Sequence, residues 1–369
     1  MKSLSLSGKN WILKKFDQSD LSFIKENFYL DEITSKLLSI RKINRKDVYG
    51  FLNPSIKNFL PNPNDLIDMK KSTLRTIEAI KNKEKIAIFG DYDVDGATST
   101  ALLGNYFSEL KIDYEIYIPD RKKEGYGPSI ESFEKLINKK VNLIFTVDCG
   151  TLSFEAIEFA KNNYVDVIVL DHHQSEIKLP SAFSIVNPNR IDDKSNLNYL
   201  CAAGVTMMFL TALNKSLRLN NLFKYKKSLE PNLLNFLDLV CLGTICDVVP
   251  LVGLNRAFVK QGLKVIKNKR NIGIKSLYDI MNIQNSPNTY QVGYLIGPQI
   301  NAGGRVGKSS HGSDLLMTND AAMAFKIATD LKKSNEERKL IESNLIEEVD
   351  AIAKKNISDP ILLLSGTNW

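Results

Sequence analysis

Cysteine and long apolar runs are both scarce in this sequence. Four cysteines among 369 residues are too few for a disulfide framework, and none forms a CxxC pair of the kind that binds structural zinc. The most apolar stretch, 237–246, contains Asp238 and is far shorter than a membrane span of roughly 20 residues. Because the N-terminus also lacks the apolar core of a signal peptide, we expect a cytoplasmic protein with no membrane partner.

The composition excludes wholesale disorder and collagen-like structure. Apolar residues make up 43% of the chain and charged residues 25%, which is ordinary for globular proteins. The net charge of +7 is a mild excess, compatible with an anionic partner without requiring one. The length predicts two or three compact units.

Short apolar segments alternate with helical patterns in the middle of the chain. We expect strands at 85–89, 114–118, 143–147 and 167–170, separated by helices at 97–110, 129–138 and 154–162. This alternation is typical of βαβ units, so it predicts an α/β fold with a parallel sheet.

The flanking regions are expected to be helical. Apolar residues at helical spacing cover 21–40, several helices follow residue 200, and 321–355 resembles one long amphipathic helix followed by an apolar strand at 360–364. We therefore expect a helical lead-in at 1–82, the main α/β domain with a helical subregion at 83–320, a connecting helix at 321–357 and the start of a further domain at 358–369.

Acidic residues and histidines follow the predicted strands. Asp91, Asp93 and Asp95 follow the first strand, Asp148 the third, and Asp171, His172 and His173 the fourth, while Asp247 is a further candidate. Ligands of parallel sheets bind beyond the carboxyl ends of the strands, so these groups are expected to meet in one crevice. So many carboxylates repel one another unless cations compensate them. Oxygen and imidazole ligands suit Mn²⁺ or Mg²⁺, and several carboxylates suggest two ions, as in phosphoryl chemistry.

Each of these features also has a simpler interpretation. The DxDxDG pattern opens calcium-binding loops, but here a strand precedes it and Leu102 stands where such a loop needs glutamate. Asp148 could cap a helix, and adjacent histidines can be purely structural. We interpret Cys149 and Cys246 as packing residues and His311 as a loop residue.

Two further segments carry arginines. The glycine-rich segment 297–307 is expected to be a loop in which Arg305 could approach a phosphate, and a basic loop at 120–127 contains Arg121. Two other basic runs, one from Lys215 to Lys227 and one from Lys264 to Arg270, could line a channel or simply face solvent.

The motifs DYDVDG, TVDCGT, LDHHQ and GTICDVVPL, in that order, resemble those of the DHH phosphoesterase superfamily. Within it, IPDRKKEGYGP and GPQINAGGRVG are similar to segments of the RecJ family of single-strand-specific exonucleases. The resemblance implies a parallel-sheet DHH phosphoesterase domain. It also implies that the chain ends where the second phosphoesterase domain, called DHHA1, would begin.

The resemblance implies two divalent cations, Mn²⁺ or Mg²⁺, and a set of six metal ligands: Asp91, Asp93, Asp95, Asp148, His172 and Asp247. Asp148 would bridge both ions. Gln299 stands where the family usually has an arginine.

Five residues are implied around the substrate. His173 would face the phosphate, Asp171 would orient the imidazoles, and Arg305 would hold the scissile phosphate. Arg121 would sense a 5′-terminal phosphate, and Asn301 would stiffen the glycine-rich loop.

The implied activity is 5′ to 3′ hydrolysis of single-stranded DNA by a metal-activated water, in DNA repair and recombination. Single-strand-binding protein and a helicase are the implied partners of a monomeric enzyme. The alternatives are a DHH phosphoesterase for oligoribonucleotides, cyclic dinucleotides or pyrophosphate, and a catalytically weak DNA-binding fragment.

Overall fold

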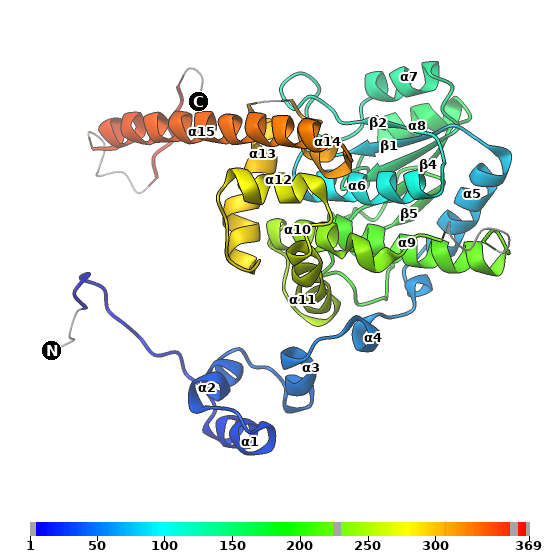
Figure 1. Ribbon diagram of the computed structural model, residues 1–369. Coiled ribbons are helices and arrows are strands. Elements are labelled where there is room, and N and C mark those ends of the chain that lie inside the picture. The colour runs from blue at the N-terminus through cyan, green and yellow to red at the C-terminus, as the bar shows by residue number, and fades with distance from the viewer. Residues whose placement is uncertain (1–4, 224–229, 307, 355–360, 367–369) are drawn as a thin grey trace.

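A five-stranded parallel sheet forms the centre of the computed structural model, which describes residues 5–223, 230–306, 308–354 and 361–366 (Figure 1). The strand order is β2-β1-β3-β4-β5, and every neighbouring pair is parallel. The strands are β1 (Ile86–Gly90), β2 (Tyr114–Tyr117), β3 (Leu143–Val147), β4 (Asp166–Leu170) and β5 (Ser184–Val186). The α/β class is confirmed, and the short strand β5 is an addition to the four predicted strands.

Alternate side chains of the strands enter two different cores. In β1, Ala87 and Phe89 pack with α7 (Ile130–Asn138) and α8 (Phe154–Asn162) on one face. Ile86 and Ile88 pack on the other face with α5 (Met69–Asn82), α6 (Val94–Glu109) and α9 (Ala202–Leu219). Because both faces are covered, the central strands are fully buried, which explains their uninterrupted apolar sequences.

Helices form most of the chain after β5. They are α10 (Leu237–Cys246), α11 (Gly253–Lys267), α12 (Ile272–Ile280), the π-helical turn η5 (Gln291–Ile296), α13 (Gly297–Arg305), α14 (His311–Met317) and α15 (Ala321–Ala353). A 3₁₀ turn, Leu233–Phe236, precedes α10. Helix α10 packs against α6 and α11, so that its C-terminal end reaches the carboxyl edge of the sheet. No helix in the described ranges is long and apolar enough to cross a membrane.

The N-terminal region is a separate small helical unit below the sheet domain (Figure 1). It contains α1 (Gln18–Phe28), α2 (Glu32–Ile40), α3 (Val48–Leu52) and α4 (Ile56–Phe59), with 3₁₀ turns at Arg45–Asp47 and Pro63–Asp65. The helical segment expected at 21–40 is two helices, because Tyr29 adopts a left-handed conformation and ends the first. Ile24, Leu38 and Val48 form the core of this unit.

The glycine-rich segment that we expected to be a loop is the helix α13, so that expectation is wrong. Pro298 stands in its first turn, a position that suits proline. Its glycines permit close packing: a Cβ at Gly297 would lie 2.4 Å from the sulfur of Cys246, and one at Gly304 would lie 3.0 Å from Tyr92. His311, expected in a loop, begins α14.

The long helix is confirmed as α15, but the strand expected after it does not form in residues 361–366. Ile361 and Leu363 are exposed, and no strand among the described residues lies beside them to supply hydrogen bonds. Pro360 lies outside the described residues.

Candidate metal centre

Three aspartates follow β1, and amides at helix N-termini fix two of them. Asp93 caps α6, because its Oδ1 accepts the amide of Gly96 at 2.9 Å. The carboxylate of Asp95 accepts the amides of the first two residues of α9 at 2.6 and 2.9 Å. Asp91 is buried at the end of β1. Amides at helix N-termini carry partial positive charge, so they hold these carboxylates at the carboxyl edge of the sheet.

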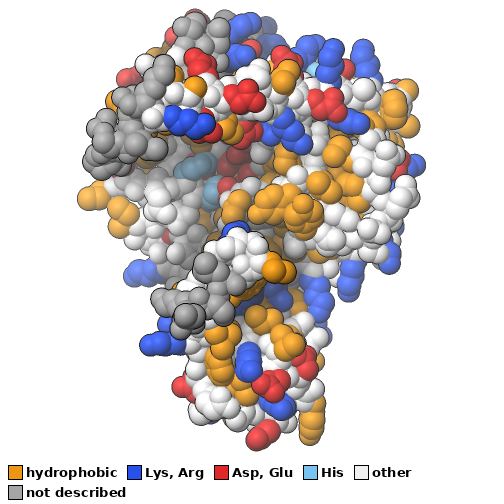
Figure 2. Space-filling model, turned by 90° about the vertical axis from the view of Figure 1, so that its left-hand side faces the viewer, with side chains coloured by type: hydrophobic (Ala, Val, Ile, Leu, Met, Phe, Trp, Pro, Cys, Tyr) orange, Lys and Arg blue, Asp and Glu red, His pale blue; other side chains and the backbone are white. Residues whose placement is uncertain are grey.

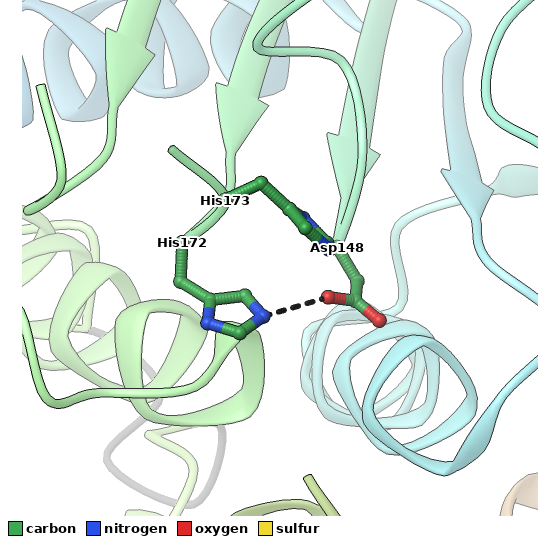
Figure 3. A group of neighbouring side chains, drawn as sticks. All are labelled: Asp148, His172 and His173. Carbon is green, nitrogen blue, oxygen red and sulfur yellow. Dashed lines mark ion pairs between the residues drawn. The ribbon is translucent and has the colours of Figure 1, made fainter. Parts of the chain in front are cut away.

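Asp148 follows β3 in a left-handed conformation, with a φ of 60°. This conformation is uncommon for residues other than glycine, although aspartate tolerates it better than most. The side chain is buried, and the hydroxyl of Tyr126 donates to its backbone carbonyl at 2.9 Å. The hydrogen bond from Tyr126 therefore helps to fix this turn. The turn directs the Asp148 carboxylate toward the histidines that follow β4 (Figure 3).

Asp171 organises the two histidines after β4. Its Oδ1 accepts the backbone amide of His172 at 2.7 Å and lies 2.7 Å from Nδ1 of His173, while Oδ2 accepts the amide of Thr151 at 3.1 Å. Burial opposes the charge of Asp171, but these hydrogen bonds and the charge of His173 hold its pKa well below its ordinary value. In turn, the hydrogen bond to Asp171 raises the pKa of His173 to about 9. This geometry agrees with the orienting role expected for Asp171.

His172 faces three carboxylates. Its Nε2 lies 3.3 Å from Asp148 Oδ1 and 3.7 Å from an oxygen of both Asp95 and Asp247 (Figure 3 shows the first contact). Asp247 reaches this point as the C-cap residue of α10. Residues from four separate parts of the sequence therefore meet, as the strand-end pattern predicts.

The site has ligand atoms that the protein itself does not satisfy. Four buried atoms have no hydrogen-bond partner: Asp91 Oδ1, Asp148 Oδ1, His172 Nε2 and Asp247 Oδ2. Burial, followed by the neighbouring carboxylates, raises the pKa of Asp91 to about 7 and that of Asp247 to about 8. Unpartnered buried acceptors are rare in folded proteins, so this donor set fits divalent cations.

The ligand atoms fall into overlapping groups. Within each group the ligand atoms lie within 4.8 Å of one another. The first group is Asp95, His172 and Asp247, and the second is Asp91, Asp93 and Asp148. The third group is Asp148, His172 and His173. The first two groups share no residue. All six predicted metal ligands are therefore brought together, in an arrangement with room for two ions.

The residues expected to bind phosphate surround Tyr92. The guanidinium of Arg121 lies 5.3 Å from the centre of the Tyr92 ring, and the charges of Arg121 and Arg305 both oppose the rise in the pKa of Tyr92 that burial causes. Asn301 Oδ1 accepts the amide of Val94 at 3.0 Å, which ties α13 to the start of α6. Asn301 thus belongs to a helix rather than to the expected loop. Gln299 is buried, and its amide donates to Leu295 O at 3.1 Å.

The basic runs are partly occupied by other contacts. Arg218 pairs with Glu230, and Lys269 lies 3.4 Å from Asp279. The lysines at 224, 226 and 227 lie outside the described residues.

Two asparagines were missed by the sequence analysis. The amide of Asn187 donates to His173 O and Thr151 Oγ1, each at 2.9 Å, and Asn189 donates to His172 O. They follow β5 as the aspartates follow β1, so recognising that strand would have identified them. Tyr126 was also missed, although it contacts His173 and lines a cavity of about 670 Å³ between the first turns of α7 and α8.

Comparisons with known proteins agree with this geometry. Residues 85–244 match the model of the DHH family, N-terminal domain. The single-stranded-DNA-specific exonuclease RecJ of Haemophilus influenzae is 38% identical over 297 residues, which are 80% of this chain and 51% of that protein. The chain thus spans about half the length of the curated relatives it matches.

Two solved structures are similar as well. A crystal structure of exonuclease RecJ bound to manganese shares 32% identity and a TM-score of 0.69, with 77% of this chain and 69% of that chain covered. RecJ from Thermus thermophilus in complex with Mn²⁺ shares 28% identity and a TM-score of 0.75, with 91% and 46% covered. The chain therefore belongs to the DHH family of phosphoesterases. Within that family, the relatives described here are RecJ exonucleases.

Proposed function

We propose that this chain is a metal-dependent exonuclease that hydrolyses single-stranded DNA from its 5′ end. One observation carries the proposal: buried, unpartnered oxygen and nitrogen atoms from four segments converge at the carboxyl edge of the sheet. Relatives named as single-stranded-DNA-specific exonucleases, and similar structures that hold Mn²⁺, support the choice of substrate and metal.

The metal ligands in this proposal are the six residues Asp91, Asp93, Asp95, Asp148, His172 and Asp247. When bound, two divalent cations supply a water of lowered pKa and neutralise charge on the phosphate. Carboxylates caged by helix amides keep the ligand positions fixed, so little reorganisation accompanies the reaction.

The remaining residues handle the substrate. Its raised pKa keeps His173 protonated at neutral pH, so the imidazolium can donate a hydrogen bond to a phosphate oxygen, while Asp171 fixes the ring. We assign the scissile phosphate to Arg305 and the 5′-terminal phosphate to Arg121, whose guanidinium can pair with two phosphate oxygens.

The proposed setting follows from the substrate. Single strands arise where a helicase opens duplex DNA and where single-strand-binding protein covers the product, so we propose these two partners and a role in repair and recombination. We further propose that the chain acts in the cytoplasm as a monomer, which light scattering after size-exclusion chromatography tests.

The test is a time course on 5′-labelled DNA with Mn²⁺, with Mg²⁺ and with a chelator. We expect mononucleotides to be released from single strands with either metal, and no release from duplex or in chelator. Release from the 3′ end, or equal cleavage of duplex, would contradict the proposal. A competing dinucleotide that is hydrolysed in preference to the long strand would favour the oligonucleotide-specific DHH enzymes instead.

A further inference from the structure

Two exposed tyrosines stack on each other beside η5. The ring centres of Tyr290 and Tyr294 lie 5.2 Å apart with an angle of 27° between the planes, and the residues are 62% and 72% exposed. Among the Phe and Tyr ring pairs in the described ranges, this is the one pair with both rings exposed. Neither phenol oxygen makes a hydrogen bond within the described part of the chain. Both side chains are therefore largely free to contact a ligand from solvent.

The backbone explains why the rings align. Tyr290 immediately precedes the π-helical turn η5, and the wide turn brings residues four apart onto one face. Val292 and Ile296 are buried on the inner face, which leaves the two tyrosines on the outer face. π-Helical turns are rare, and they are frequent at functional sites.

The turn that carries the two tyrosines packs against the helix that leads into the metal centre. The sulfur of Cys246 lies 3.7 Å from Val292 O, and Gly297 packs directly against Cys246, so η5 covers the last turn of α10. Asp247 directly follows Cys246 as the C-cap of α10, and α13, which carries Arg305, begins where η5 ends. Figure 2 shows acidic and histidine side chains in a surface recess that has hydrophobic side chains along part of its border.

We propose that Tyr290 and Tyr294 form a stacking platform for the bases of a single strand whose phosphodiester lies at the metal centre. This inference rests on the proposed function. Aromatic rings bind every base through its face, and each such contact is worth about 1–3 kcal/mol. An uncharged contact also suits a rim that contains carboxylates, which repel the phosphates of the strand.

The platform would also help to select single strands. In a duplex, both faces of each internal base are covered by its neighbours, so no internal base is free to stack on the tyrosines. Exclusion of duplex would then begin with recognition of bases on this face.

The test measures the affinity of the 369-residue chain in chelator for a 5′-phosphorylated, fluorescent single-stranded oligonucleotide. Replacing both tyrosines (Tyr290→Ala with Tyr294→Ala) is expected to weaken the Kd at least tenfold, whereas the two Phe substitutions retain wild-type affinity because they keep the rings. Tyr164→Ala is the matched control: Tyr164 is 95% exposed and lies just before β4, at the opposite edge of the sheet.

Two further substrates make the result specific. An abasic oligonucleotide is expected to bind the wild type and the double Ala variant equally weakly, because it offers no base to stack. Hydrolysis of bis-p-nitrophenyl phosphate with Mn²⁺ is expected to stay within twofold in the double variant, because the metal ligands are untouched.

An unchanged Kd of the double Ala variant for the normal strand would overturn the platform. An equal loss of affinity for the abasic strand would also overturn it, and so would a parallel loss of bis-p-nitrophenyl phosphate hydrolysis. If the wild type bound no single strand at all, the proposed function would fail together with this inference. Metal-dependent cleavage of single strands that does not depend on the tyrosines would reject this inference alone.

Discussion

Single side chains in the metal centre have separable roles, and Asp148 is the clearest case. It faces His172 and belongs to two of the three ligand groups, but it contributes little to the apolar core. We expect Asp148→Asn to lower the hydrolysis rate by about 10³-fold or more, because a ligand is lost. Thermal unfolding in chelator should be unchanged or shifted upward, since burial and, after it, neighbouring carboxylates raise the pKa of Asp148 well above its ordinary value.

Metal binding supplies the independent readout for this variant. A cation that binds the folded state stabilises it by mass action, by about 2.7 kcal/mol at a hundredfold excess over Kd. Mn²⁺ should therefore raise the Tm of the wild type and of Asp113→Asn, a control substitution at an exposed position. It should raise the Tm of Asp148→Asn much less. Activity within tenfold of the wild type would contradict the ligand role.

Arg305 tests the phosphate side of the centre. We expect Arg305→Ala to lower kcat/KM by about 10²-fold or more, because a charge-assisted donor to the phosphate is lost. Lys264→Ala, an exposed substitution in one of the basic runs, should change kcat/KM by less than threefold. Steady-state kinetics on a single-stranded oligonucleotide measure both. Equal losses would mean that Arg305 provides only general attraction for DNA.

At the scale of elements, the sequence predicted most of what positions the site. Uninterrupted apolar segments followed by aspartates located β1, β3 and β4, since burial on both faces leaves a clear pattern. The prediction from sequence failed for α13, because three glycines in nine residues normally disfavour a helix. Tertiary packing decides that case: Gly297 and Gly304 are needed for contact with Cys246 and Tyr92, and such contacts are invisible in one sequence.

Helix α10 carries a second buried carboxylate at the end opposite Asp247. Asp238 is 3% exposed, and its Oδ1 accepts the amide of Leu239 at 2.8 Å. Burial raises the pKa of Asp238 to about 7, although the backbone amides and the charge of Arg270 oppose this rise. Arg270 and Glu109 line the same cavity as Asp238. The folded protein therefore binds the proton more tightly than the unfolded chain. The stability associated with this group is present near pH 4 and is lost as the pH rises through 7.

We expect Asp238→Asn to remove this dependence. The asparagine retains an acceptor for Leu239, so the variant should match the wild type near pH 4 and exceed it at pH 8 by up to about 4 kcal/mol. Denaturant unfolding at several pH values measures the difference. Parallel curves for the two proteins would show that Asp238 ionises freely in the folded state.

At the scale of the whole molecule, the N-terminal helical unit is joined to the sheet domain through α11. Arg256 donates to Phe51 O at 2.6 Å, and its guanidinium lies 3.8 Å from the centre of the Phe51 ring. Lys260 adds a contact to Leu52 O at 3.3 Å. Ile56 and Phe59 of α4 also pack against the main core, and Arg256 adds polar and cation–π contacts to this apolar attachment.

We expect Arg256→Ala to increase the rate of limited proteolysis within residues 41–60 at least threefold. Loss of a hydrogen bond from a charged group and of a cation–π contact explains the loosening. The Mn²⁺-induced rise in Tm should persist, because the metal centre lies in the sheet domain. Unchanged proteolysis would mean that α4 alone secures the unit.

The proposed metal ligands come from segments that begin at Asp91 and end at Asp247, and Asp95 also holds the start of α9. A chain emerging from the ribosome therefore cannot assemble this metal centre until α10 has been made and has docked on α6. Nascent fragments that end before this point lack Asp247, so the complete set of proposed ligands exists only after α10 has been made.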